Sequence, residues 1–218
     1  MKILVCSCDN NRDIWLPFHH CMEKYWPDHY DIIYLTDTLD NPYYKTIKKN
    51  YPINQWTRRV REACSEINDD KIFLMCDDVF LQNKVNTNEI DALLNFITDD
   101  VGSINLQVGG DYNSTIVGNN LRLMTEDAKY KTSVMCSIWN KNALLNIFKD
   151  NLDPWSFEMK NIHMNYLYYR LEYPVMIWGG EYSGKLFGVF RGKWVKSAKK
   201  FLDDEGLNIN YNKRGFYD

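Results

Sequence analysis

Two adjacent carboxylates, Asp77 and Asp78, follow directly on an apolar run from Ile72 to Cys76. Such a run is typical of a strand buried on both faces of a parallel sheet, and ligands bind where these strands end. Neighbouring carboxylates repel each other and lose solvation there, so a bound cation would stabilise them. Because Mg²⁺ and Mn²⁺ bind both carboxylate and phosphate oxygens, we expect a metal–diphosphate site at Asp77 and Asp78. A solvated turn that carries two acids is the alternative.

A second group of candidate residues lies near the C-terminal end, in the segment Phe190-Arg-Gly-Lys-Trp194. The planar guanidinium of Arg191 can bind phosphate through two hydrogen bonds, and Lys193 offers a compact positive charge. Both could stabilise the negative charge that develops on a departing nucleoside diphosphate. Since further lysines follow as far as Lys200, an ordinary exposed basic face is the alternative.

A third candidate is Glu158, in the segment Asp153-Pro-Trp-Ser-Phe-Glu158. Pro154 indicates that a helix begins here, and the dipole at a helix start stabilises an anionic carboxylate. If its side chain faces the crevice, Glu158 could remove a proton from an acceptor hydroxyl as a general base, or orient that hydroxyl. A glutamate that only complements the helix dipole is the alternative.

Arg58 and Arg59 lie at the start of the helix that precedes the two acids, in Gln55-Trp-Thr-Arg-Arg59. One of these arginines could reach a nucleotide or its phosphates. His163 could complete a metal shell, but a lone histidine beside apolar and aromatic residues is more typical of a structural role.

The elements expected around these residues alternate between strands and helices. In chain order they are a strand at 2–8, a helix that begins near Pro17, a strand at 31–37, a helix capped by Thr57, the strand that ends at Asp77, a helix at 88–97 and a strand at 101–107. This alternation predicts an α/β fold with a mostly parallel central sheet flanked by helices.

The second half of the chain is expected to form a smaller mixed region that recognises the acceptor. Its predicted elements are strands near 121–124 and 134–139, a helix near 142–148, and glycine turns at 109–110 and 179–180. We therefore expect a single domain over 1–218, or one domain of a longer protein. It would comprise a nucleotide-binding half at 1–107, an acceptor-side half at 108–190 and a closing tail at 191–218.

The composition of the 218 residues is that of a globular protein, with 45% hydrophobic and 25% charged residues. The formal net charge of −3 argues against a general nucleic-acid binder. The sequence has no apolar run long enough to span a bilayer and no signal-peptide pattern at its start, so we expect a cytoplasmic protein with its six cysteines reduced. Lys196, Lys199 and Lys200 would support at most a peripheral membrane contact.

These segments, taken in order, resemble the nucleotide-sugar glycosyltransferases of the GT-A fold, specifically small bacterial and viral enzymes that build surface glycans. Ile3-Leu-Val-Cys-Ser-Cys-Asp9 resembles the first strand of that fold, whose end contacts the nucleoside, and Trp56-Thr-Arg-Arg59 resembles a nucleotide-side helix segment. Leu74-Met-Cys-Asp-Asp-Val-Phe-Leu81 resembles the metal-binding DxD region, although Cys76 stands where that motif has its first acid. Pro154–Glu158 resembles the segment with the acceptor-side acid, and Gly188–Trp194 the closing tail.

The resemblance implies a glycosyltransferase that moves a sugar from a UDP- or dTDP-sugar to a glycan acceptor, in polysaccharide or glycoprotein glycan synthesis. It implies Mn²⁺ or Mg²⁺ as cofactor and assigns the metal to Asp77 and Asp78, the base role of an inverting reaction to Glu158, and the nucleotide to Cys8, Asp9, Arg58, Arg59, Arg191 and Lys193. No residue identifies the base, the donor sugar or the acceptor. The content of 15 Tyr, 10 Phe and 7 Trp keeps a non-catalytic carbohydrate-binding protein as an alternative, and a metal-dependent nucleotide phosphohydrolase is another.

Overall fold

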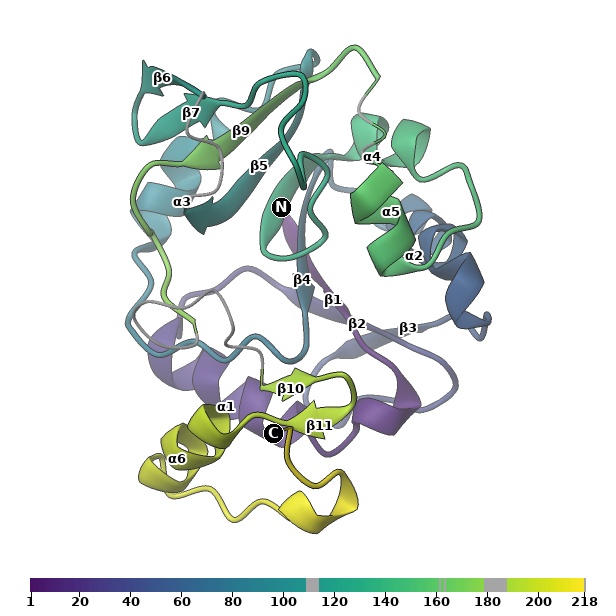
Figure 1. Ribbon diagram of the computed structural model, residues 1–218, viewed down its shortest axis with the longest axis vertical. Helices are drawn as coiled ribbons and strands as arrows, with labels where there is room; N and C mark the ends of the chain where they lie inside the picture. Colours follow the sequence, from purple (N-terminus) through teal and green to yellow (C-terminus); the bar gives the residue numbers. More distant parts are fainter. Residues whose placement is uncertain (109–113, 161, 163, 179–187, 218) are drawn as a thin grey trace.

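A nine-stranded sheet forms the centre of the computed structural model, which describes residues 1–108, 114–160, 162, 164–178 and 188–217 (Figure 1). From edge to edge its strands are β3 (Lys45–Lys48), β2 (Ile32–Thr36), β1 (Lys2–Cys6), β4 (Lys71–Cys76), β8 (Ser137–Asn140), β5 (Val101–Val108), β9 (Leu167–Leu171), β7 (Leu121–Leu123) and β6 (Thr115–Gly118). The helices are α1 (Trp15–Tyr25), α2 (Trp56–Ser65), α3 (Thr87–Leu94), α4 (Lys141–Ile147), α5 (Pro154–Lys160) and α6 (Lys196–Asp204), with short 3₁₀ turns at Asp9–Asn11, Ile53–Gln55 and Tyr211–Lys213.

Most strands of this sheet run in one direction, as predicted. β3, β2, β1 and β4 pair in parallel, and β5 pairs in parallel with β9. β8 is antiparallel to both β4 and β5, and β7 is antiparallel to β9 and β6. The predicted α/β fold with a mostly parallel sheet is therefore confirmed. One feature differs, because β8 from the second half of the chain is inserted between two strands of the first half.

The two faces of the sheet bury alternate residues of each strand. Ile3 and Val5 of β1 pack with residues of α1, α3 and α6, whereas Leu4 and Cys6 pack with residues of α2, α4 and α5. This alternation follows from the two-residue period of a strand. Helices cover both faces, which explains why β1 and β4 are apolar nearly throughout and why their sequences predicted buried strands.

Helix α2 begins differently from the sequence prediction. Its N-cap is Gln55, and the prediction that Thr57 caps this helix is wrong. The Thr57 hydroxyl is buried and accepts a hydrogen bond from the Leu152 backbone N–H at 2.9 Å, while it donates to the carbonyl of Asp150. Thr57 therefore joins α2 to the loop before α5, a contact between distant segments that helix-capping rules do not predict.

Three strands of the central sheet lie outside the predicted elements. β3 lies between the strand predicted at 31–37 and the helix that Thr57 was expected to cap; only Ile47 of its residues is buried, so no apolar pattern marks it. β6 has four exposed residues, and β9 follows a turn in the second half. The glycine pairs at 109–110 and 179–180 lie outside the described residues.

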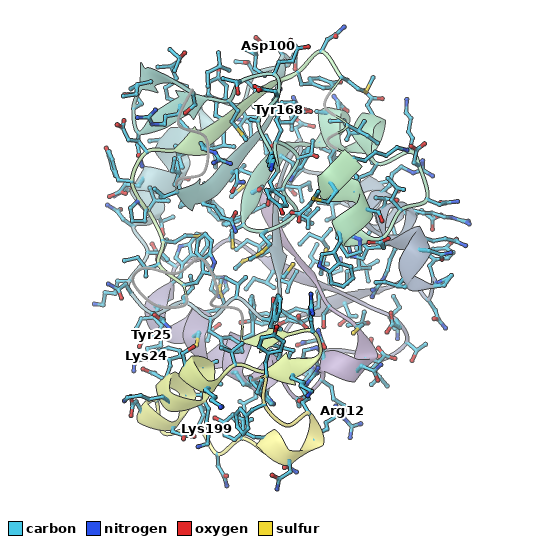
Figure 2. All side chains as sticks on the ribbon, in the orientation of Figure 1. Arg12, Lys24, Tyr25, Asp100, Tyr168 and Lys199 are labelled. Carbon is cyan, nitrogen blue, oxygen red and sulfur yellow. The ribbon has the colours of Figure 1, made fainter. Side chains whose placement is uncertain are left out.

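The C-terminal segment packs against α1. It begins with the hairpin of β10 (Val189–Phe190) and β11 (Lys193–Trp194) and continues into α6. Glu205, after α6, accepts hydrogen bonds from Lys24 at 2.6 Å and from the Tyr25 hydroxyl at 2.6 Å, and lies 2.8 Å from His20 Nε2. Figure 2 shows Lys24 and Tyr25 beside α6 at this end of the molecule. These donors hold the pKa of Glu205 at about 2 against the opposing effect of burial.

Two of the three lysines of α6 are paired within their own helix. Lys199 forms an ion pair with Asp203, and Lys200 is 2.5 Å from Asp204. Because Lys199 and Lys200 each have an acidic partner four residues on, their contribution to the positive charge that a membrane contact would need is largely neutralised. Across the described part of the chain, no helix has the length and hydropathy needed to span a bilayer.

Candidate functional site

A cavity of about 810 Å³ opens at the carboxyl end of β4. Three of the predicted site residues, Asp78, Glu158 and Arg191, line it together. They come from the end of β4, from α5 and from the β10–β11 turn, so three distant segments build one site. The other lining residues are Cys76, Gln107, Tyr130, Ser133, Val134, Met135, Pro154, Trp155, Val189 and Phe190.

Asp78 lines this cavity at the end of β4. No side chain among the described residues donates a hydrogen bond to its carboxylate, while burial and the nearby Asp77 raise its pKa to about 8. Its backbone carbonyl accepts a hydrogen bond from Gly188 N–H at 2.7 Å. A Cβ at Gly188 would lie 2.2 Å from the ring of Phe80, so the close approach of these two segments requires glycine. A bound cation or a proton would offset the free-energy cost of burying the Asp78 carboxylate beside Asp77.

Asp77 has a different environment from its neighbour. Its carboxylate is 2% exposed and accepts hydrogen bonds from Ser7 Oγ at 2.5 Å and from Asn11 Nδ2 at 3.1 Å. Ser7 Oγ in turn accepts from Trp15 Nε1 at 2.8 Å. Burial raises the pKa of Asp77 to about 7, and these two donors oppose the shift. Both carboxylate oxygens of Asp77 therefore bind the segment after β1, and Asp77 does not line the cavity.

Arg214 supports this arrangement and was not among the residues predicted from sequence. Its guanidinium is nearly buried and binds Asp13 with two hydrogen bonds, at 2.8 and 2.7 Å. It also donates to Asn11 Oδ1 at 3.0 Å and to the Asn10 carbonyl at 2.6 Å. Its positive charge opposes the rise that burial causes in the pKa values of Asp77 and Asp78. Asp13 and Arg214 are 201 residues apart in the chain, and no local pattern signals their contact.

Glu158 is held in the cavity by one of its oxygens. Oε1 accepts hydrogen bonds from the Val134 backbone N–H at 2.9 Å and from Ser133 Oγ at 3.1 Å, and burial raises its pKa. The expected place of Glu158 at the helix start is wrong, because Asp153 occupies that position and accepts from Ser156 N–H at 2.9 Å. Burial in the cavity rather than the helix dipole therefore dominates the environment of Glu158.

Arg191 and Gly192 form the two-residue turn of the β10–β11 hairpin. Their φ angles are 50° and 78°, both left-handed, as a type I′ turn requires. Asparagine and glycine usually occupy such positions, so an arginine here is uncommon. The Arg191 guanidinium lies 5.4 Å from the ring centroid of Phe190 and reaches the cavity. Lys193, on β11, is exposed and does not line the cavity.

The remaining predicted nucleotide ligands lie away from the cavity. The Asp9 carboxylate accepts the backbone N–H groups of the loop after β2, at 3.2 Å from Asp37 and 3.1 Å from Leu39. Arg59 is buried and joins the same loop, with its terminal nitrogen 3.2 Å from an oxygen of Asp37. Cys8, the residue before Asp9, is half-buried, and burial raises the pKa of its thiol. This cluster stabilises the carboxyl ends of β1 and β2.

Arg58 points elsewhere. Its Nε donates to Glu62 at 2.9 Å, and its guanidinium lies 4.4 Å from the ring centroid of Tyr51 on the surface of α2. The spacing of Arg58 and Glu62, four residues apart on a helix, is the signal in the sequence that favours this local pairing.

The described side chains of this site could bind a divalent cation only together with a bound substrate that supplies further oxygen atoms. Over the described ranges, no group of three or more His, Cys, Asp or Glu side chains could hold a metal ion by itself. His163, the predicted additional ligand, lies outside the described residues. Mg²⁺ typically keeps several waters and binds one or two carboxylates together with substrate phosphates. Asp78, which is desolvated and has no side-chain partner among the described residues, suits that mode of binding.

Comparison with known proteins found similarity in structure alone. No protein-family model matches the sequence, and no curated protein matches it significantly. The galactosyltransferase LgtC, solved with donor and acceptor sugar analogues, is 12% identical over 98% of this chain and 82% of its own, with a TM-score of 0.43. TarS 1–349 of S. aureus in complex with UDP is 10% identical over 78% of this chain and 59% of its own, with a TM-score of 0.48. The bifunctional IspDF of Campylobacter jejuni is 13% identical over 76% of this chain, with a TM-score of 0.42.

The match with IspDF spans only 52% of that protein. Any assignment of function therefore depends on the residues that line the cavity.

Proposed function

We propose that the protein is a metal-dependent glycosyltransferase that moves a sugar from a nucleotide-diphosphate sugar to a glycan acceptor. The observation that carries this proposal is the meeting of Asp78, Glu158 and Arg191 in one cavity. Sugar transfer needs a group that anchors the diphosphate, a cation that stabilises the leaving group, and, when the configuration inverts, a base for the acceptor hydroxyl. The three side chains have the chemistry for these three roles.

Each residue has a distinct part in this proposal. Asp78 would hold Mn²⁺ or Mg²⁺, which supplies charge stabilisation to the diphosphate when bound. Arg191 would donate hydrogen bonds to the departing nucleoside diphosphate, whose negative charge grows during the reaction. Glu158, fixed through Oε1, would accept the proton of the acceptor hydroxyl on Oε2. A retaining reaction would not need this base.

The donor can be tested by thermal unfolding with UDP and dTDP, each with and without Mn²⁺. A nucleotide at a hundredfold its dissociation constant should stabilise the protein by about 2.7 kcal/mol, and we expect this gain to depend on Mn²⁺. A screen of nucleotide sugars should then release the nucleoside diphosphate. Release of pyrophosphate from a nucleoside triphosphate would instead indicate a nucleotidyltransferase, and release of phosphate a phosphohydrolase. Indifference to every nucleotide would refute the proposal and favour a carbohydrate-binding protein.

The base assignment predicts the effect of Glu158→Gln. This variant should lose sugar transfer by about 10²- to 10⁴-fold and keep nucleotide binding, because the amide retains the shape but cannot accept the proton. Burial raises the pKa of Glu158, so wild-type transfer should decline as pH falls through that raised value and the base becomes protonated. Kinetics of transfer over pH 5–9 measure both effects.

Asp153→Asn is the matched control, since it removes a carboxylate from the same segment while asparagine still caps the helix. Its transfer rate should equal that of the wild type. Full activity in Glu158→Gln would exclude Glu158 as the base and favour a retaining reaction.

A further inference from the structure

Three exposed aromatic residues, Trp155, Tyr130 and Phe190, line the cavity that contains Glu158, and the ring of Phe190 packs against Tyr217. The side chain of Trp155 on α5 is 68% exposed, and that of Tyr130 is 47% exposed. Large aromatic rings are usually buried in cores, as Phe157 is, two residues after Trp155. The exposed rings leave flat apolar surface beside a carboxylate that has one oxygen without a partner in the described part of the chain.

The segment that carries Tyr130 has a strained backbone. Tyr130 and Cys136 have φ angles of 56° and 39°, a left-handed conformation that bulky residues rarely adopt. Between them, Ser133, Val134 and Met135 line the cavity, and the first two bind Glu158. Strained residues of this kind persist only where surrounding contacts hold them, and they concentrate at ligand sites.

We propose that Trp155 and Tyr130 form an acceptor subsite in which an aromatic ring stacks on the apolar face of a pyranose ring. A pyranose presents C–H groups on one face and hydroxyls at its edge. The stacked sugar would therefore place a hydroxyl toward Oε2 of Glu158. Rigid aromatic rings supply large contact area at low entropic cost, while a few polar groups set orientation. The reading of this sugar as the acceptor rests on the proposed transferase function.

The cavity has room for this arrangement. Its volume of about 810 Å³ lies in the range of small-molecule sites, and Asp78 and Arg191 line it together with the aromatic residues. The carboxyl groups of Asp78 and Glu158 line the cavity and repel an anionic ligand when they are ionised, which favours a neutral sugar beside Glu158. The aromatic side chains therefore suit an uncharged acceptor ring, and Arg191 the charged leaving group.

Saturation-transfer NMR with methyl β-D-galactopyranoside and methyl β-D-glucopyranoside tests the subsite directly, in the presence and absence of UDP with Mn²⁺. Wild-type protein should transfer saturation to the ring C–H protons of at least one glycoside. Trp155→Ala should lower the affinity for that glycoside about tenfold, and Trp155→Phe should retain most of the affinity. Because Trp155 is largely exposed, neither change should unfold the protein. Tyr173→Ala is the matched control: Tyr173 is 57% exposed and lines a separate cavity of about 520 Å³, so glycoside binding should not change.

Equal glycoside affinity in Trp155→Ala and wild type would overturn the subsite, as would the absence of binding under both conditions. Weaker UDP binding in Trp155→Ala would also overturn it, because the ring would then contact the nucleotide. Hydrolysis of the nucleotide sugar without acceptor separates the two proposals. Hydrolysis at the wild-type rate in Trp155→Ala, with glycoside binding lost, supports both. Glycoside binding through Trp155 in a protein that cleaves no nucleotide sugar supports the stacking site and contradicts the transferase.

Discussion

Asp78→Asn is expected to abolish sugar transfer and, in protein free of metal and nucleotide, to stabilise the fold. An asparagine cannot supply the negative charge that holds a divalent cation on the diphosphate, so transfer should fall about a thousandfold or more. The same substitution removes a buried charge that repels Asp77 and has no side-chain partner in the described structure. The transfer rate and the midpoint of thermal unfolding, measured on the same preparation, should therefore change in opposite directions.

The stability part of this prediction depends on pH. The pKa of Asp78 is raised from 3.8 to about 8 in the folded state, so the unfolded chain releases this proton at lower pH than the folded protein does. Between these values the folded state binds more protons, and wild-type stability must fall as pH rises. The asparagine variant lacks this dependence. Its advantage in unfolding temperature should be small near pH 4, grow up to about pH 8 and then level off.

Asp203→Asn serves as the control, because it removes a carboxylate on α6 whose partner is Lys199. It should leave transfer unchanged. An Asp78→Asn protein that keeps wild-type transfer and the same response to Mn²⁺ would show that the metal site lies elsewhere.

Arg214→Ala should lower the free energy of unfolding by about 3 kcal/mol, since removing one partner of a nearly buried ion pair leaves the other charge uncompensated. Arg214 makes two hydrogen bonds to Asp13 and one to Asn11, whose amide binds Asp77. Its loss should thus also loosen the contacts of Asp77 and reduce transfer. Urea denaturation and steady-state kinetics measure the two effects.

Lys213→Ala is the matched control for this variant. Lys213 is the preceding residue and contacts the same Asp13, at 3.2 Å, but its side chain is 45% exposed. An exposed pair contributes about 1 kcal/mol or less, so this variant should be nearly as stable as the wild type. If both substitutions lower the free energy of unfolding by similar amounts, the Arg214 guanidinium does not hold the C-terminal segment in place. Arg214→Lys keeps the charge without the planar guanidinium, so its free energy of unfolding should lie between those of Arg214→Ala and Lys213→Ala.

The sequence was sufficient to predict the part of the fold that depends on local pattern. Apolar runs predicted β1, β2, β4 and β5, because a strand covered on both faces must be apolar along its length. Polar residues directly after β4 predicted a site at its carboxyl end, and a cavity lies there. Asp78, Glu158 and Arg191, which line this cavity, were predicted as site residues in this way, since each interrupts or ends a segment whose neighbours are apolar or aromatic.

The tertiary structure alone decided which of the predicted residues meet. Adjacent acids look equivalent in a sequence, but Asp77 binds Ser7 and Asn11 while Asp78 faces the cavity. That difference depends on where the segments containing Met135 and Val189 pack, far along the chain. The insertion of β8 between β4 and β5 and the contact of Arg214 with Asp13 have the same origin. Residue type and periodicity report the environment of a segment, whereas the identity of its neighbour is set by packing of the whole chain.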